Sequence, residues 1–370
     1  MPPVNRHVLI IGPSLRYLGG QAVSAQRLLT GLRTLRSPTV EYLEVDPVLP
    51  GPLSLLQRFP VIRTLATSVS YIFTLLRRVP SADTLHIYSA AYWSFLIAPT
   101  PAILIGRLFG KRVIVNYKSG EADDHLTRWG WHAKPLLKLA DEIVVPTAFL
   151  VGVFSKHGLH STAIPNHIDV SIMTLRDRST ILPRFFANRN FERHYNVSAI
   201  IEAFAQVQEE LPEAELVIAG NGPLREELWT QAQALKLRNV RFTGPVQPSE
   251  MPALYAAADV YVNASLIDNM PLSLLEAYAA ELPVVTSDAG GIPWIARNGD
   301  TATVVPAGDV QALVAAMLDA VTVPDAAQAR AARARQFVSE TFSWDVVRSQ
   351  WLSVYAAVGS NADGVSGRGE

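Results

Sequence analysis

The sequence predicts an α/β protein made of two parallel-sheet domains, and three observations support this. Strand-like apolar runs alternate with helical patterns along the whole chain, which is typical of parallel α/β layers. The alternation pauses near residue 165 and then restarts. The length of 370 residues, with 49% hydrophobic and 18% charged residues, is enough for two globular domains with a core each.

The first half shows a strand, a glycine turn and a helix, followed by further strands. His7–Ile11 predicts the first strand, and Gly19-Gly20 opens a helix whose apolar residues follow helical spacing. Ile87–Gly106 carries no charge, but two prolines interrupt it, so we interpret it as a buried strand and a packed helix rather than a membrane span. Further strands are predicted over 84–88, 112–116 and 142–145.

The second half repeats the alternation after a connector over 170–183. A helix is predicted around 200–207, and strands over 216–219, 240–242, 260–262, 284–286 and 303–305. A last helix is predicted over 344–358, with Ser343 as its N-cap. We therefore predict a first domain over 1–168, a second over 169–342, a C-terminal helix over 343–358 and a disordered Gly/Ser/Asp-rich tail over 359–370.

Charge and cysteine content restrict the classes of function. A formal net charge of −1 gives no global reason to expect a nucleic acid partner. The chain has no cysteine, which excludes disulfides, thiolate catalysis and cysteine-ligated zinc, and suits a reducing compartment. No His/Asp/Glu spacing stands out as a metal site, and the first apolar run is too short for a secretory signal. We expect a cytoplasmic protein.

The segment from Leu53 to Arg78 mixes apolar residues with four arginines. Such a segment could lie on an anionic membrane surface, at the inner face of the membrane. We favour the alternative that it is an amphipathic helix pair packed on its own domain.

Asp268–Glu276, with the sequence DNMPLSLLE, is the stretch richest in functional signals. It follows a predicted strand, and Pro271 fits the first turn of a helix. The inward positions of this helix should include Leu272, Leu275 and Glu276. A carboxylate on an apolar face needs a hydrogen-bond partner, either a ligand hydroxyl or a buried basic residue. The sequence leaves a ligand role and a structural ion pair equally open for Glu276.

Two glycine pairs and one arginine offer groups for an anion. Gly19-Gly20 lies at a strand-to-helix turn, and Gly290-Gly291 directly follows a strand. Glycines let a ligand approach the backbone, and helix N-termini offer unpaired N–H groups, although a simple tight turn is the more common explanation of a pair such as Gly19-Gly20. Arg189 precedes a helix, and a guanidinium suits a diphosphate, while a lone surface arginine is the plain alternative.

Polar residues also follow the predicted strands of the first domain and could face an acceptor as acid/base or hydrogen-bonding groups. A solvated loop is the alternative for Asp123 and Asp124. The candidates are His86, Lys118, Glu121, Asp123, Asp124 and His125.

These motifs together resemble the retaining family-4 glycosyltransferases of GT-B fold. The resemblance is specific over about 185–310 and looser in the first domain, where Gly19-Gly20 and Ile164–Asp169 carry it. The matching text is Arg189-Asn-Phe, Ala219-Gly-Asn-Gly-Pro223, Phe242-Thr-Gly244, Ala258-Asp-Val-Tyr-Val262, Asp268–Glu276, Pro283-Val-Val, Gly290-Gly-Ile-Pro293, Val305-Pro and Gly308-Asp309.

The resemblance implies two Rossmann-like domains whose parallel sheets face across a cleft, with the last helix crossing back to the first domain. It implies that Asp268 and the backbone after it contact the donor sugar and diphosphate, that Glu276 binds the ribose and that Arg189 binds the diphosphate. Gly19-Gly20 would close over the phosphates. The remaining donor-binding residues by this resemblance are Gly220, Asn269, Met270, Pro271, Leu272, Ser273, Gly290 and Gly291. The family needs no metal or other cofactor.

The sequence departs from the family pattern at several positions. Tyr195 stands where the family has a diphosphate lysine, with His194 or Arg193 as substitutes. Glu281 and His167 replace usual glycines. Ala302-Thr303 replaces a glycine-leucine pair, and the family's histidine in the first domain has no secure counterpart, since His86 and Lys118 both lie near the expected strand ends.

The resemblance implies a retaining hexosyltransferase that moves a sugar from a nucleoside-diphosphate donor, such as a UDP-sugar, to an acceptor hydroxyl. A glycan in polysaccharide biosynthesis, a lipid-linked sugar or a small molecule could be the acceptor. Two alternatives stay open: a sugar-nucleotide epimerase of the same fold, and a nucleotide-binding homologue without turnover.

Overall fold

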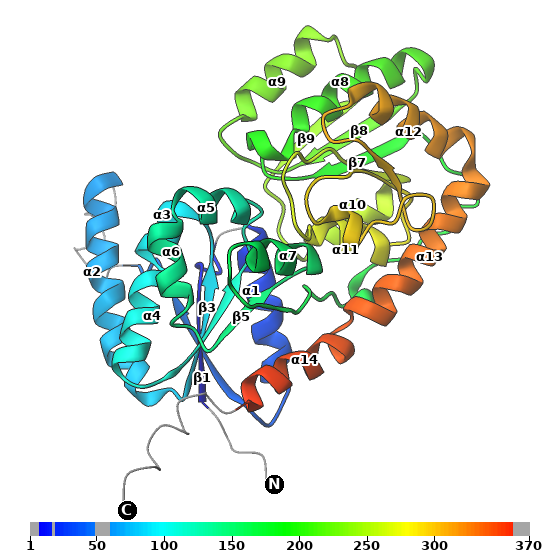
Figure 1. Ribbon diagram of the computed structural model, residues 1–370. Helices are drawn as coiled ribbons and strands as arrows, with labels where there is room; N and C mark the ends of the chain where they lie inside the picture. The colour runs from blue at the N-terminus through cyan, green and yellow to red at the C-terminus, as the bar shows by residue number, and fades with distance from the viewer. Residues whose placement is uncertain (1–6, 17–18, 49–59, 358–370) are drawn as a thin grey trace, which may run out of the picture. The chain divides into compact units, whose positions relative to one another are not determined.

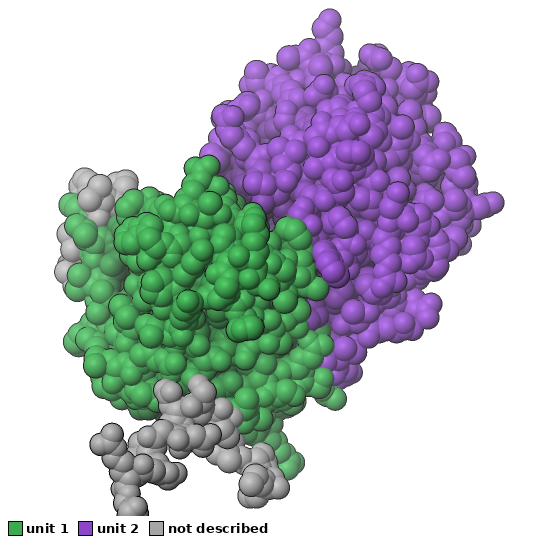
Figure 2. Space-filling model, viewed as in Figure 1, with its two compact units in different colours: residues 1–17, 21–164, 347–370 green, residues 18–20, 165–346 purple. Residues whose placement is uncertain are grey.

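The computed structural model describes residues 7–16, 19–48 and 60–357. The predicted tail over 359–370 and residues 53–59 lie outside them. The chain divides into two compact units (Figure 2). Unit 1 comprises residues 1–17, 21–164 and 347–370, and unit 2 comprises residues 18–20 and 165–346.

Unit 1 contains a six-stranded parallel sheet in the order β2-β1-β3-β4-β5-β6. The order reverses between β1 and β3, which is where α/β sheets of this kind bind ligands outside their carboxyl ends. The strands are β1 His7–Gly12, β2 Thr39–Glu44, β3 Thr84–Ser89, β4 Arg112–Tyr117, β5 Glu142–Val145 and β6 Thr162–Ala163. The predicted strands at β1, β3, β4 and β5 are confirmed, whereas the edge strands β2 and β6 were not predicted.

Helices cover both faces of the unit 1 sheet (Figure 1). Side chains of β1 and β3 pack into one hydrophobic core together with Tyr71 and Leu75 of α2 and Ile103 of α4. The strand residues in this core are Leu9, Ile11, Leu85 and Ile87. The helices of unit 1 are α1 Gly20–Arg33, α2 Pro60–Arg78, α3 Tyr92–Ile97, α4 Pro99–Leu108, α5 Ala122–Arg128, α6 Gly130–Leu137 and α7 Ala148–Lys156. The uncharged run over 87–106 is thus the end of a strand followed by two helices.

The side chains of helix α14, Trp344–Ala356, pack on the opposite side of that sheet. Val347, Trp351 and Tyr355 are at most 2% exposed, and the ring of Trp351 stacks on His86 of β3. The helix begins in unit 2 and continues in unit 1, because the boundary between the units falls after Val346.

Unit 2 contains a second six-stranded parallel sheet, in the order β12-β11-β10-β7-β8-β9. Counted along the chain this is the doubly wound order 3-2-1-4-5-6, which reverses between β7 and β10. The strands are β7 Arg184–Asn188, β8 Glu215–Ala219, β9 Val240–Gly244, β10 Val260–Asn263, β11 Val284–Ser287 and β12 Thr303–Val305. Five of them were predicted, but the central strand β7 was not, although Phe185-Phe186-Ala187 is a buried apolar run.

The helices of unit 2 pack on this sheet around one core, in which Phe204 of α8 and Met317 of α12 are fully buried. They are α8 Val197–Glu210, α9 Arg225–Ala234, α10 Met251–Ala257, α11 Leu272–Ala279, α12 Val310–Thr322 and α13 Pro324–Phe342. Among the described residues, no single helix has the length and apolar character to cross a bilayer. Only α12 and α13 taken together pass that test, and they are bent by 97° at the break between them.

Candidate functional site

The strands β7 and β10 bring Arg189 and Asp268 together where the strand order of unit 2 reverses. Arg189 directly follows β7, and Asp268 lies in the loop after β10. The guanidinium Nη2 donates to Asp268 Oδ2, and Nη1 donates to Ser273 Oγ at 3.3 Å. Both ionic side chains are nearly buried, at 10% and 12% exposure. Carboxyl ends of parallel strands at such a reversal are where α/β sheets bind ligands.

Arg189 keeps its charge in this buried position. Burial is the largest single influence and works to lower its pKa, but Asp268 and the neighbouring tyrosines together outweigh burial, and the net result is a raised pKa. Its Nε is buried and has no hydrogen-bond partner among the described residues. A buried charged donor of this kind calls for an acceptor, and an anionic ligand oxygen would supply one.

Tyr195, which stands where the resemblance places a lysine, packs on Arg189. The guanidinium carbon lies 4.0 Å from the centroid of the tyrosine ring. The neighbouring His194 carbonyl accepts hydrogen bonds from the backbone of Leu266 at 2.8 Å and Ile267 at 3.3 Å. Residues 194–195 therefore hold the loop that leads to Asp268 in place. It offers the site an aromatic face in place of a second fixed charge.

Glu276 lies on α11 and has a partner that the sequence did not indicate. The hydroxyl of Tyr255, on α10, donates to Glu276 Oε2 at 2.8 Å. Asn188 Nδ2 donates in turn to the Tyr255 hydroxyl at 2.9 Å. One partner of the carboxylate is thus a tyrosine hydroxyl. Burial, followed by Glu276, raises the pKa of Tyr255 well above its usual range, so the hydroxyl stays protonated and can donate.

The inward positions predicted for α11 are confirmed as buried, but the helix is buried on every other side as well. All residues from Leu272 to Ala279 are buried, and α13 packs against α11. Pro271 is the N-cap rather than a first-turn residue, so the helix begins one position later than expected. An apolar helix under a second helical layer has no solvent face to reveal by periodicity.

Gly290 and Gly291 allow two loops to touch. A Cβ on Gly290 would lie 2.2 Å from the carbonyl oxygen of Asp268, and one on Gly291 would lie 2.3 Å from that of Asn269. The Gly291 N–H donates to the Asp268 carbonyl at 2.9 Å. These glycines therefore hold the Asp268 loop in place, which is a structural reason for their presence that the sequence did not show.

Gly220 has a similar structural role beside Arg189. It adopts φ +148°, and a Cβ there would lie 2.2 Å from the Arg189 carbonyl oxygen. Met270 is also held by its neighbours, since Asn166 Nδ2 donates to its carbonyl at 3.1 Å. The predicted donor-binding residues over 268–273, 220 and 290–291 thus lie around one point of unit 2.

Gly19 and Gly20 show no such packing requirement. A Cβ at either position would meet open space, and neither has a positive φ. Gly20 begins α1, so the pair lies after β1, where the strand order of unit 1 reverses. The structure gives no packing reason for these glycines, and their predicted contact with phosphates stays a prediction.

His86 and His125 do not face solvent, contrary to the expectation for acceptor-side residues. His86 lies in the middle of β3 and is 0% exposed. Its Nδ1 is 2.7 Å from the Tyr355 hydroxyl, and its Nε2 is 3.0 Å from Asn116 Nδ2. Burial lowers the pKa of His86 to about 3. It is therefore a neutral core residue with both ring nitrogens engaged inside unit 1.

His125 is also 0% exposed, and its Nδ1 is 2.8 Å from the Tyr117 hydroxyl. Burial lowers its pKa to about 4. The sequence gave no sign of this burial, because α5 places His125 inward only through its packing on Tyr117 and Phe95.

Lys118 and Glu121 remain near the carboxyl end of the unit 1 sheet. Lys118 directly follows β4, and burial lowers its pKa to about 7 even though part of the side chain stays accessible. Glu121 is exposed. A lysine that titrates near neutrality can exchange protons with a substrate, so Lys118 keeps the chemical character expected of an acceptor-side group.

Tyr92, which the sequence did not single out, lies in the same region. It adopts φ +54°, an uncommon conformation for a bulky residue, at the start of α3 just after β3. Its hydroxyl donates to Asp124, and its ring meets Trp129 edge to face. Trp93, which is 65% exposed, also packs edge to face on Trp129. Strained backbone concentrates at functional sites, so this aromatic cluster is a second candidate region.

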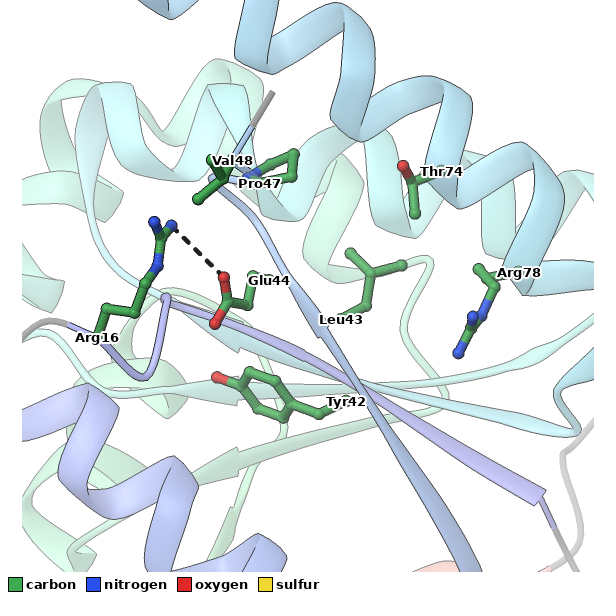
Figure 3. Close-up of a pocket in the computed structure, with 8 residues that line it drawn as sticks. All are labelled: Arg16, Tyr42, Leu43, Glu44, Pro47, Val48, Thr74 and Arg78. Carbon is green, nitrogen blue, oxygen red and sulfur yellow. Dashed lines mark ion pairs between the residues drawn. The ribbon is translucent and has the colours of Figure 1, made fainter. Parts of the chain in front are cut away.

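A cavity of about 420 Å³ in unit 1 lies between β2 and α2 (Figure 3). Its basic side chains are already engaged, since Arg16 pairs with Glu44 at 3.5 Å and Arg78 with Glu41 at 2.5 Å. None of the predicted site residues lines it. It therefore offers no free charge to an anionic ligand.

No cluster of three or more histidine, aspartate or glutamate side chains suited to a metal ion occurs within 7–16, 19–48 and 60–357. The candidate site of unit 2 instead consists of an arginine, two carboxylates, hydroxyl groups and loop backbone. These groups suit a phosphate-bearing ligand.

Comparison with known proteins finds a family similar to unit 2. Residues 183–337 match the family model described as glycosyl transferases group 1. Glycogen synthase of Mycobacterium tuberculosis is 30% identical over 276 residues, which cover 70% of this chain and 66% of the relative. The phosphatidyl-myo-inositol mannosyltransferase of Mycobacterium leprae is 30% identical over 214 residues, 56% of each chain. The chain thus spans just under two thirds of one relative and about half of the other.

Solved structures establish the fold of the whole chain. Anabaena HepE, crystallised in complex with UDP and glucose, aligns with a TM-score of 0.75 at 15% identity and covers 95% of this chain and all of its own. Sucrose-phosphate synthase from Thermosynechococcus elongatus aligns with a TM-score of 0.76 at 18% identity, covering 95% of this chain and 98% of its own. The chain therefore has the GT-B fold, and its residues 183–337 match the family model of group 1 glycosyl transferases.

Proposed function

We propose that this protein transfers a sugar from a nucleoside-diphosphate-sugar to an acceptor hydroxyl, with retention of anomeric configuration. The observation that carries the proposal is the buried Arg189–Asp268 pair at the strand reversal of unit 2. The family match over 183–337 and the UDP complexes of HepE support the same class of donor.

Each residue of the site has a distinct task in this proposal. The leaving diphosphate gains charge as the bond to the sugar breaks, and Arg189 stabilises that charge from a buried position. The Asp268 loop, with the start of α11 behind it, lies where the donor sugar and diphosphate would bind. Glu276, oriented by Tyr255, accepts hydrogen bonds from the ribose. No protein nucleophile and no metal is part of the proposal, so chelators are expected to leave transfer unchanged.

The acceptor side is proposed to lie at the carboxyl end of the unit 1 sheet. Tyr92, Asp124 and Trp129 combine an aromatic surface with a carboxylate, which suits a sugar ring and its hydroxyls. Lys118, with its pKa near 7, is the group best suited to take up the proton of the acceptor hydroxyl. A glycan and a lipid-linked sugar are both acceptors of this kind, and the relatives' names include a glycogen synthase and a phosphatidylinositol mannosyltransferase.

The substitution Glu276→Ala tests the proposal. We expect it to reduce transfer by at least about 100-fold, because it removes the carboxylate that accepts hydrogen bonds from the ribose hydroxyls. The protein should still fold. Tyr255→Phe is the matched variant, since it keeps the carboxylate but removes the hydrogen bond that orients it. It should raise the KM for the donor more than it lowers kcat. Turnover of Glu276→Ala near that of the wild type would exclude the assigned role.

Tyr195 favours one alternative, a homologue that binds the nucleotide without turnover. The tyrosine removes one of two expected positive charges from the diphosphate site. Incubation with donor alone and with donor plus acceptor separates the cases. A transferase consumes the donor mainly when an acceptor is present, whereas an epimerase converts it without one. A binding protein shows a ligand-induced rise in Tm and leaves the donor intact.

A further inference from the structure

The outer face of α2 is an exposed apolar surface that sugar transfer does not use. Tyr71 and Leu75 on its inner side are 0% exposed, and the Tyr71 hydroxyl donates to the Ala98 carbonyl at 3.0 Å. Six large apolar side chains on the outer side are between 41% and 68% exposed. They are Ile62, Leu65, Val69, Ile72, Phe73 and Leu76.

These six residues form one continuous stripe. At about 100° of rotation per residue, they fall within an arc about 100° wide. Figure 1 shows α2 at the margin of unit 1, beside α4, against which it packs. An exposed apolar stripe of this length on a surface helix marks a surface that binds something. The inner side of α2 packs on its own domain, but its outer side is apolar as well.

The charges on α2 indicate what the stripe binds. The helix has arginines at 63, 77 and 78 and no acidic residue. Arg78 pairs with Glu41 and is not counted here. Arg63 and Arg77 are exposed, and the helical rotation puts both on the same flank of the stripe. The Arg77 guanidinium lies 5.7 Å from the Phe73 ring centroid, so the charge and the apolar surface adjoin.

We propose that the outer face of α2 docks the protein on an anionic lipid bilayer. Apolar side chains along one side and arginines along the flank are the arrangement of a helix that lies in the interface plane of a membrane. The arginines then meet lipid phosphates, whose negative charge attracts them to the surface. A second copy of the chain fits less well, since two α2 helices face to face would bring together arginines and no acidic residue. The proposal does not depend on sugar transfer.

Vesicle sedimentation of the full-length protein tests the proposal. The probes are vesicles of phosphatidylcholine alone and of phosphatidylcholine mixed with phosphatidylglycerol. We expect the wild type to sediment with the mixed vesicles, and added salt to weaken this binding. The triple variant Leu65→Gln, Val69→Gln, Phe73→Gln should bind at least about tenfold more weakly, because it removes most of the apolar area that enters the bilayer.

Two control variants separate the contributions. Trp229→Gln with Leu235→Gln removes exposed apolar side chains from unit 2 and should leave vesicle binding unchanged. Arg63→Gln with Arg77→Gln should abolish the preference for phosphatidylglycerol and keep a weak binding to both vesicles. Circular dichroism and the Tm rise caused by UDP show whether the triple variant is folded, independently of lipid.

Equal vesicle binding by the wild type and a folded triple variant would overturn the proposal. So would wild-type protein that ignores both vesicles but forms a dimer that the triple variant does not form, because the stripe would then serve a second copy.

Discussion

The two sheets have the same number of parallel strands, but the ionisable residues near their reversal points differ in position and in charge. In unit 2, Arg189 and Asp268 lie beyond the strand ends at the reversal point, and the arginine keeps its charge and an unpartnered Nε. In unit 1, His86 lies within a strand, is neutral and has partners for both ring nitrogens. The topology thus locates a crevice in each unit, but only the position relative to the strand end separates a site residue from a core residue.

Arg189→Met should produce the largest effect on the unit 2 side of this comparison. We expect at least a 100-fold loss of kcat and a loss of the Tm rise caused by UDP, because the charge that faces the diphosphate is removed. The free energy of unfolding should also fall by about 3 kcal/mol, because Asp268 loses its partner in a nearly buried position. Steady-state kinetics and urea unfolding measure the two effects. Arg225→Met, at an exposed position of the same unit, is the control and should change neither.

The substitution Tyr195→Lys tests whether the tyrosine ring beside Arg189 makes donor binding weaker than a lysine would. Without a donor, the new ammonium lies beside the Arg189 guanidinium, so the Tm should fall. With UDP, both charges face the diphosphate, and affinity should rise about tenfold. Calorimetric titration of wild type and variant with UDP measures this. Unchanged affinity would mean that the side chain of residue 195 does not face the diphosphate.

His86→Gln tests the unit 1 side and should leave the KM for donor and acceptor unchanged. The folded histidine has its pKa lowered to about 3, whereas the unfolded chain binds a proton near pH 6.5. Stability from His86 is therefore fully present above about pH 6.5 and is lost as the pH falls toward 3.

The Tm of the wild type should consequently fall more steeply with acid than that of His86→Gln. His160→Gln, at an exposed position, should keep the wild-type slope. A parallel pH dependence in wild type and His86→Gln would contradict the buried, neutral state. An increase in the KM for the acceptor in His86→Gln would indicate that His86 contributes to acceptor binding after all.

Much of the fold could be predicted because buried parallel strands are continuous apolar runs. Nine of the strands were found in this way. Strand β7 was missed because it follows closely on an irregular connector, and β2 because most of its residues are partly exposed at a sheet edge, which weakens the apolar signal. Boundaries of this kind depend on tertiary packing that a single sequence does not encode locally.

The site was predictable where a short stretch carries its own pattern, as at Asp268–Glu276. Contacts between distant segments were not predictable, among them the hydrogen bond from Tyr255 to Glu276 and the stacking of Tyr195 on Arg189. The burial of His86 also depends on Tyr355, which is 269 residues away in the sequence. Nothing near His86 in the chain distinguishes it from a histidine at a strand end.

The path of α14 has a consequence for how the protein is made. Trp351 and Tyr355, within residues 347–357, pack on the sheet of unit 1. The strands of that sheet all come before residue 164 in the chain. During synthesis, unit 2 emerges whole while the face of unit 1 around His86 still lacks its cover. The first unit translated is therefore the last to be completed, because its cover around His86 comes from the end of the described chain.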